Sequence, residues 1–242
     1  VHTINTGGIV DSVKFSPIKN QIAIAAQDKI FTYDIGTKHQ KSFPNPQSKH
    51  TAVTSLAFNS DGSKLFSAHD EGFLKVWDVN THELLDTVFF TSTYPPYLTD
   101  PLKSVAISDS DHFVVTGSKA IGIYDLLKEE KHTPLWGHHG FFSAFAFVPN
   151  TEILVAAESD GAIIVWNMDT GKIIKAFHSG LKKIYSLDVS PNGKHLAFSG
   201  SGGVVKVWHN FLECISPCSI VKYTKTGGAK LALYHQATLD SV

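Results

Sequence analysis

The sequence predicts an all-β fold assembled from repeated units of similar length. The first observation is a short apolar strand that closes on an aromatic residue and recurs five times along the 242-residue chain. The closing aromatics stand 44, 47, 42 and 42 residues apart and are Tyr33, Trp77, Tyr124, Trp166 and Trp208. The second observation is that strand-like runs separated by turn residues fill the intervals. A period of about 40–45 residues with four strands per unit is the size of one blade of a β-propeller.

The second repeat shows the four strands most clearly. Val53–Phe58 is expected to be its inner strand, and Asn59–Gly62 is a turn sequence between two strand-like runs. Lys64–Ala68 and Phe73–Asp78 follow as the second and third strands, and Glu83–Phe89 as the outer strand. The third strand is a continuous apolar run in several repeats, which is typical of a strand buried on both faces between neighbouring sheets.

The remaining repeats follow the same order. We expect one propeller domain over residues 1–242, with blades at residues 7–43, 50–90, 102–135, 137–177 and 178–216. The third blade is degenerate, because Ser118–Ala120 lacks the usual Asp-Gly turn. The longest connection, residues 91–101, carries Tyr94 and Tyr97, and insertions of this kind map to loops in repeat proteins.

The two chain ends are expected to form a partial sixth blade. Residues 1–6 alternate apolar and polar side chains as a strand does, and residues 217–242 are too short for a whole repeat. Strands from the two ends of a chain can pair to close a ring and remove exposed sheet edges. The alternatives are a fragment of a seven-bladed ring and a ring completed by another chain. The start at Val1, partway through a repeat, fits a piece of a longer protein.

The third strand of the second repeat ends in Trp77-Asp78, and Trp166-Asn167 and Trp208-His209 occupy the same place in later repeats. The dipeptide and the regular period together make the chain resemble the WD-repeat family over most of its length. The resemblance implies a buried network in each blade: a histidine before the inner strand, a hydroxyl in the second strand, an acidic residue in the next turn, and the tryptophan. Buried polar groups of this kind must be hydrogen-bonded.

No repeat carries the complete network. Glu71 stands where aspartate is usual, and Ala156 and Phe198 stand where a hydroxyl is usual, so the blades are expected to depend on apolar packing. The structural residues that the resemblance assigns are Tyr33, His50, Ser67, Trp77, Asp78, Tyr124, His138, Asp160, Trp166, His178 and Trp208.

The resemblance also implies a non-catalytic protein–protein interaction scaffold, a subunit of a larger intracellular complex that docks peptides or domains on the top face of the ring. Aromatic residues are enriched at the cores of interfaces. The partner-binding candidates are the residues at the entries to inner strands and in the long loop: Phe141, Phe142, Lys183, Tyr185, Tyr94 and Tyr97. Phe142 and Tyr185 have a second interpretation, in which they pack between blades.

Two other function classes are weaker. The formal net charge is −1, and all 21 basic residues are lysines, so the arginine fork that reads phosphate and guanine is missing. An RNA- or acidic-lipid-binding propeller would depend on a lysine stripe made of Lys172, Lys175, Lys182 and Lys183. A propeller enzyme is the second alternative, but we find no Gly-x-Ser-x-Gly elbow, and Ser199–Gly203 leads into a strand rather than a helix. No catalytic or cofactor-binding residue is predicted.

Metal binding and secretion are not indicated either. His138 and His139 lack a surrounding Cys/His set with zinc spacing, and His209 with Cys214 and Cys218 is a weak signal. One cysteine pair is no disulfide framework, and we find no Asn-x-Ser/Thr site. No apolar run approaches the ~20 residues needed to cross a bilayer. These features favour a reducing compartment, the cytoplasm or the nucleus.

Overall fold

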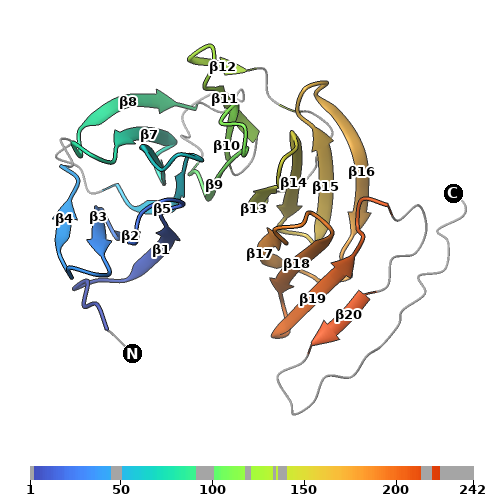
Figure 1. Ribbon diagram of the computed structural model, residues 1–242. Coiled ribbons are helices and arrows are strands. Elements are labelled where there is room, and N and C mark those ends of the chain that lie inside the picture. Colours follow the sequence, from blue (N-terminus) through green and yellow to red (C-terminus); the bar gives the residue numbers. More distant parts are fainter. Residues whose placement is uncertain are drawn as a thin grey trace, which may run out of the picture. The chain divides into compact units, whose positions relative to one another are not determined.

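The computed structural model describes residues 3–44, 51–90, 101–117, 121–132, 135, 141–213 and 220–223. These residues form twenty β-strands and no helix, and the strands make five four-stranded antiparallel sheets (Figure 1). The all-β prediction is therefore confirmed. The described part of the chain accordingly contains no helix that could cross a membrane. The chain divides into two compact units, Val1–Trp136 and Gly137–Val242.

The first unit contains three sheets. The first sheet consists of β1 (Val10–Phe15), β2 (Gln21–Ala26), β3 (Lys29–Asp34) and β4 (Gln40–Ser42). The second consists of β5 (Val53–Phe58), β6 (Lys64–His69), β7 (Phe73–Asp78) and β8 (Leu84–Phe89). The third consists of β9 (Ser104–Ile107), β10 (Phe113–Gly117), β11 (Ile121–Asp125) and β12 (Glu130–His132).

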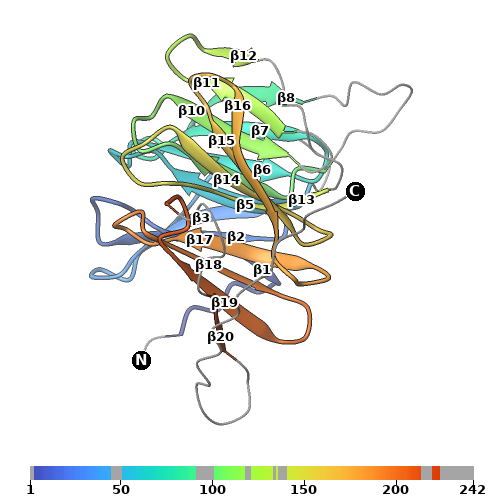
Figure 2. The same cartoon turned by 90° about the vertical axis from the view of Figure 1, so that its right-hand side faces the viewer.

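The second unit contains two sheets. The fourth sheet consists of β13 (Phe142–Phe147), β14 (Ile153–Glu158), β15 (Ala162–Asn167) and β16 (Lys172–His178). The fifth consists of β17 (Ile184–Val189), β18 (His195–Gly200), β19 (Val204–His209) and β20 (Ile220–Tyr223). Within this unit the inner strands β13 and β17 lie next to each other (Figures 1 and 2). In every sheet the strands are hydrogen-bonded in chain order, as expected for a propeller blade.

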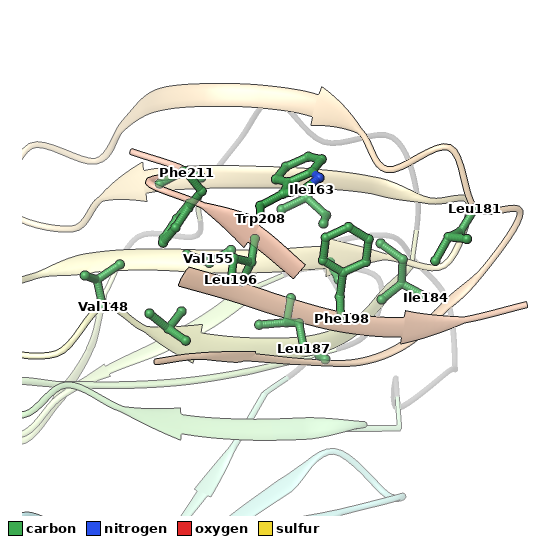
Figure 3. Packing of buried hydrophobic residues seen from close by; sticks show 14 of the residues in the cluster. Val148, Val155, Ile163, Leu181, Ile184, Leu187, Leu196, Phe198, Trp208 and Phe211 are labelled. Atoms are coloured by element: carbon green, nitrogen blue, oxygen red, sulfur yellow. The ribbon is translucent and has the colours of Figure 1, made fainter. Parts of the chain in front are cut away.

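The sheets of each unit pack face to face through apolar side chains. In the first unit, Trp77 of the second sheet lies in one cluster with Ala23 and Ile30 of the first sheet, and its ring meets that of Phe43 at 5.5 Å between centroids. In the second unit, Val155 and Ile163 of the fourth sheet share a cluster with residues of the fifth, among them Leu187, Phe198 and Trp208 (Figure 3). The five recurring aromatics are all buried: Tyr33, Trp77, Tyr124, Trp166 and Trp208.

Two serines of the first unit tie its inner strands together. The Ser12 Oγ accepts a hydrogen bond from the Leu56 N–H at 3.1 Å, and the Ser55 Oγ accepts one from the Val105 N–H at 3.3 Å. The two serines occupy the same position in β1 and β5, so the bond repeats from one sheet to the next. It satisfies a backbone donor that the antiparallel ladder leaves unpaired.

The chain ends differ from the prediction. Residues 3–6 are described and contain no strand, so this part of the predicted end strand is wrong. Ile220–Tyr223, assigned by sequence to a partial sixth blade, pairs with β19 as the fourth strand of the fifth sheet, for example Trp208 with Ile220. The fifth sheet therefore extends past residue 216, and the partial sixth blade is not confirmed.

Candidate functional site

Four of the five inner strands carry a β-bulge at their second residue. The register with the neighbouring strand shifts between Val10 and Ser12, Val53 and Ser55, Phe142 and Ala144, and Ile184 and Ser186. A bulge leaves one residue out of the ladder, re-aims its side chain and occurs often beside functional sites. The residues between these pairs are Asp11, Thr54, Ser143 and Tyr185.

Three of the four bulge side chains bond to the backbone nearby. The Thr54 hydroxyl contacts the Leu102 carbonyl oxygen at 2.6 Å and the Ala68 carbonyl oxygen at 3.2 Å. The Ser143 hydroxyl donates to the Ala157 carbonyl oxygen at 3.2 Å. The Asp11 carboxylate accepts the Gln27 N–H at 3.4 Å. These side chains hold their sheets in place.

Tyr185 is the exception among the bulge residues. Its side chain is 62 % exposed, and its hydroxyl has no hydrogen-bond partner among the residues that the structure describes. Apolar ring surface left in contact with water is unfavourable, and at this exposure most of the ring contributes nothing to the core. The bulge at Tyr185 therefore presents a side chain that the described fold does not use.

The residue before each inner strand of the second unit is also exposed. Phe141 precedes β13 with 51 % of its surface exposed, and Lys183 holds the corresponding place before β17. The Phe141 carbonyl oxygen accepts the Ser159 N–H at 2.6 Å, and the Lys183 carbonyl oxygen accepts the Ser201 N–H at 2.9 Å. Each entry residue is thus fixed to the turn between the second and third strands of its own sheet.

Ser201 orders the turn that leads into β17. Its hydroxyl oxygen accepts hydrogen bonds from the N–H groups of Lys182 at 3.1 Å and Lys183 at 3.3 Å. A Cβ on Gly200 would lie 2.0 Å from the Lys183 carbonyl oxygen, so only glycine allows this approach. Both lysine side chains are exposed. The backbone of the turn is held while the two ammonium groups reach into solvent.

The connection from β16 to this turn is fixed to the fourth sheet. The Gly180 N–H donates to His178 Nδ1 at 3.1 Å, so Nε2 carries the ring proton and donates to the Asp160 carbonyl oxygen at 3.0 Å. The Ser179 N–H donates to the Gly161 carbonyl oxygen at 2.8 Å, and the Lys206 ammonium donates to the Ser179 carbonyl oxygen. We call the exposed side chains on this frame the entry surface: Phe141, Lys182, Lys183 and Tyr185.

The polar network of the second sheet differs from the predicted one. Trp77 Nε1 donates to the Ser67 hydroxyl at 2.8 Å, and that hydroxyl lies 2.9 Å from His69 Nε2. His69 Nδ1 lies 3.3 Å from the Thr51 hydroxyl. Burial, with a smaller contribution from Lys75, lowers the pKa of His69 to about 4, so the ring is neutral at pH 7. The predicted histidine, His50, lies outside the described residues.

Sequence reasoning missed His69, although a signal was present. Side chains two residues apart in a strand lie on the same face, so a histidine two positions after Ser67 was placed to reach its hydroxyl. Neighbouring Lys75 is also fully buried, with its ammonium 5.8 Å from the centre of the Trp77 ring, and burial lowers its pKa. Thr51 and His69 of this network are therefore members that the family pattern did not assign.

The tryptophans of the second unit have no such network among the described residues. Ala156 and Phe198 occupy the position of Ser67, and the buried Nε1 atoms of Trp166 and Trp208 find no hydrogen-bond partner there. This agrees with the predicted dependence on apolar packing. His178 and Asp160 do meet, but through the aspartate's backbone oxygen, and His178 belongs to the last strand of the fourth sheet rather than to the fifth repeat.

The other predicted structural residues have different contacts. The Asp78 carboxylate accepts the N–H groups of Asn80 and Thr81, both at 2.8 Å, and these bonds lower its pKa. The Tyr124 hydroxyl donates to Asp86 at 3.1 Å, and burial, followed by this bond, raises its pKa to about 12. Tyr33 is buried in the first sheet. His138 lies outside the described residues.

Among the predicted partner-binding residues, Phe142 is wrong as a surface residue. It is 2 % exposed, and its ring packs against those of Phe145 and Trp166 in the same sheet. Phe141, Lys183 and Tyr185 are exposed at the entries to the neighbouring inner strands β13 and β17. Tyr94 and Tyr97 lie outside the described residues.

The lysine stripe and the metal candidates find little support. Lys172 begins β16 whereas Lys182 and Lys183 follow its other end, and the Lys175 ammonium donates to the Phe211 carbonyl oxygen. The described residues contain no group of three or more His, Cys, Asp or Glu that could hold a metal. His209 lies with its Nδ1 3.1 Å from that of His195. His139, Cys214 and Cys218 are outside the described residues.

Comparison with known proteins decides the family. The family described as "WD domain, G-beta repeat" matches residues 39–78, 128–167 and 171–209, three stretches that each end on the third strand of a sheet. The chain is a WD-repeat protein. The matched stretches run through the third strands of the second, fourth and fifth sheets, and the entries to the inner strands of these sheets lie within them.

Curated relatives of this WD-repeat protein share parts of it. It is 33 % identical over 110 residues to the p21-activated protein kinase-interacting protein 1-like of Danio rerio, and the aligned region covers 45 % of this chain and 29 % of that protein. It is 26 % identical over 203 residues, 84 % of the chain and 21 % of the relative, to the U3 small nucleolar RNA-associated protein 21 homolog of Schizosaccharomyces pombe. It is 24 % identical to the target of rapamycin complex subunit wat1 of the same organism, over 82 % of the chain and 64 % of the relative.

Solved structures share the fold. A chain in the crystal structure of the mitotic checkpoint complex superposes with a TM-score of 0.76 at 16 % identity, over 91 % of this chain and 66 % of that one. The structure of U3-55K gives a TM-score of 0.63 at 21 % identity, over 76 % and 55 %. At such identities the likeness concerns the fold alone. The present chain spans less than two thirds of the length of each of these proteins.

Proposed function

We propose that this WD-repeat protein is a non-catalytic scaffold of an intracellular, cytoplasmic or nuclear, complex, and that partner proteins dock on the entry surface of its second unit. The observation that carries the proposal is Tyr185. It is a large aromatic at a bulge whose counterparts serve the fold, yet it is exposed and its hydroxyl is unused by the described residues. Tyrosine is enriched among the residues that dominate binding energy.

The rigid frame beneath the entry surface supports the same proposal. Phe141 and Lys183 are fixed through backbone bonds to the adjacent turns, and Ser201 holds the turn before Tyr185. A surface that is ordered before binding loses little conformational entropy when a partner docks. The names of two relatives, a subunit of the target of rapamycin complex and a U3 small nucleolar RNA-associated protein, also belong to members of larger assemblies.

The test compares partner recovery by tagged protein in cells of its source. The wild type, Phe141→Ala, Tyr185→Ala and the double variant are purified in parallel, and co-purifying proteins are quantified by mass spectrometry. Leu127→Ala is a matched control, because Leu127 is a large exposed apolar residue of the first unit. We expect the double variant to lose at least one reproducible partner about tenfold, since truncating an aromatic anchor commonly costs over 1 kcal/mol of binding.

Circular dichroism and thermal melting of each variant check that the fold is retained. If the double variant recovers the same partners in the same amounts as the wild type, the entry surface is not the docking site. If the Leu127 control loses the same partners, the effect is not specific to the entry surface, and the proposal is equally contradicted.

A further inference from the structure

We infer that the entry surface selects an acidic polypeptide segment carrying an aromatic or aliphatic anchor. This inference rests on the proposed function and names the chemistry of the partner. The anchor would pack on Tyr185 and Phe141, and carboxylates on either side of it would meet the ammonium groups of Lys182 and Lys183.

The charge of the entry surface differs from that of the chain. The sequence has 21 basic and 22 acidic residues and is nearly neutral as a whole. The segments that build the surface, residues 159–161, 178–185 and 200–203, contain Lys182, Lys183 and one acid, Asp160. The Asp160 carboxylate already accepts the Ala162 N–H at 3.0 Å. Asp188 is the next exposed acid, further along β17. The local field therefore favours a negatively charged partner.

The geometry favours an extended segment lying across the turn. Ser201 holds the backbone of both lysines, so it is a positioning residue for their side chains. Gly202 and Gly203 follow with φ of 83° and 67° and are exposed, and neither carries a side chain that would cover the turn. Tyr185 stands at the bulge, two residues after Lys183. Charged and aromatic groups thus occur within four consecutive residues, 182–185.

Nucleic acid fits this surface less well than an acidic peptide. A strand of RNA or DNA is tracked by a row of cations several nucleotides long, with bases stacked on aromatic side chains. Here Lys172 lies at the far end of β16, and the Lys175 ammonium is bound to the Phe211 carbonyl oxygen. The chain has no arginine to bind phosphate in bidentate fashion. Two lysines beside an exposed tyrosine match a short run of carboxylates with one apolar anchor.

The test measures binding of fluorescein-labelled twelve-residue peptides to the full chain by fluorescence anisotropy. The probe peptide has Asp and Glu flanking a central Phe. Two comparison peptides are measured with it: one has Ser and Gln flanking the same Phe, and the other keeps the acidic residues but has Ala at the centre. A single-stranded oligouridylate and vesicles with phosphatidylserine are measured beside them. The protein variants are Lys182→Glu/Lys183→Glu and Tyr185→Ala, with Lys172→Glu/Lys194→Glu as the matched control.

We expect the acidic Phe peptide to bind at least tenfold more tightly than either altered peptide. Charge reversal at residues 182 and 183 should weaken it at least tenfold and Tyr185→Ala about tenfold, while the control pair, exposed and distant from the turn, changes it less than twofold. Raising the salt from 50 to 300 mM should weaken binding by the wild type and leave the charge-reversed variant nearly unaffected.

Three results would overturn the inference. They are no binding of the acidic peptide at millimolar concentration, equal loss in the control pair, and tighter binding of the oligonucleotide or the vesicles through the same lysines. Ser201→Ala should weaken binding by less than the lysine reversal if it acts only through the turn. Partner proteins whose binding is weakened by changes at Phe141 and Tyr185 but not by charge reversal of the lysines would refute the acidic-peptide inference. The scaffold proposal would still stand.

Discussion

The second and fifth sheets are built on the same four-strand plan and use it in opposite ways. In the second sheet, Trp77 is tied by its N–H to Ser67, and the hydroxyl of the bulge residue Thr54 bonds to the backbone oxygens of Ala68 in β6 and of Leu102, just before β9. In the fifth sheet, Trp208 is held by apolar neighbours, and the bulge residue Tyr185 is exposed. The comparison teaches that a sheet of this plan can keep its core without the tryptophan hydrogen bond. It also shows that the bulge residue need not bond to the backbone and can instead be exposed to solvent.

The largest effect should come from the apolar side of this comparison. Trp166→Ala removes a fully buried ring from the fourth sheet, and we expect a loss of about 3–5 kcal/mol in the free energy of unfolding. The reason is the lost burial together with the cavity left behind. Urea denaturation followed by circular dichroism measures it. A loss under about 1 kcal/mol would mean that Trp166 does not hold the sheets together.

The second effect is a pH dependence that belongs to the polar network. His69 has a pKa of about 4 when folded and an ordinary value of 6.5, so the unfolded chain binds its proton more readily between these values. Stability should therefore fall as the pH drops from about 6.5 to about 4, by about 3 kcal/mol from this group. His82, whose pKa burial also lowers, acts in the same direction.

The matched measurement isolates His69. Denaturation curves at pH 7, 6, 5 and 4 are recorded for the wild type and for His69→Asn, which keeps His82. The variant should lose most of the pH slope in this window, whatever its stability at pH 7. An unchanged slope would show that His69 is not the buried neutral ring of the network.

A smaller effect should separate the two kinds of core directly. Ser67→Ala leaves the Trp77 N–H and a His69 ring nitrogen without their partner, and we expect it to cost about 1–3 kcal/mol. Ala156→Ser places a hydroxyl at the same buried position of the fourth sheet, where it can accept the Trp166 N–H, otherwise unbonded among the described residues, as Ser67 accepts that of Trp77, and should change stability by less than about 1 kcal/mol. Chemical denaturation of both variants in one buffer makes the comparison. Equal costs would erase the distinction between the cores.

The smallest effect concerns the bulge residues. Thr54→Ala gives up the hydroxyl bonds to Leu102 and Ala68 and should cost about 1 kcal/mol, whereas Tyr185→Ala should change stability by less than about 0.5 kcal/mol. Thermal melting and urea denaturation measure both. A cost at Tyr185 larger than that at Thr54 would make Tyr185 a structural residue.

The fold was largely predictable because it depends on a repeated pattern. The aromatic at the end of each third strand and the turns between strands recur at regular intervals, and burial of Trp77, Trp166 and Trp208 follows from that pattern. The chain ends were not predictable, since no repeat constrains them, and β20 completes the fifth sheet where a sixth was expected. A pattern of residue types also does not reveal which sheet a lone strand joins.

The candidate site was only partly predictable. Phe141, Lys183 and Tyr185 stand at strand entries in the sequence, but alternation alone does not tell Phe142, which is buried, from Tyr185, which a bulge turns outward. The bulge depends on a register shift between two strands, which no single run of residues encodes. The role of Ser201 could not be predicted either, because its hydroxyl bonds to the backbone of Lys183 and Lys182, which are 18 and 19 positions away in the sequence.

Hydrogen–deuterium exchange of a complex tests the central claim most directly. The full chain is compared alone and with the partner recovered by the wild type, and backbone protection is mapped by mass spectrometry. The account predicts new protection in residues 182–185 and 201–203 and little change around Thr54 in the second sheet. Protection confined to other segments, with residues 182–185 exchanging as in the unbound chain, would contradict it.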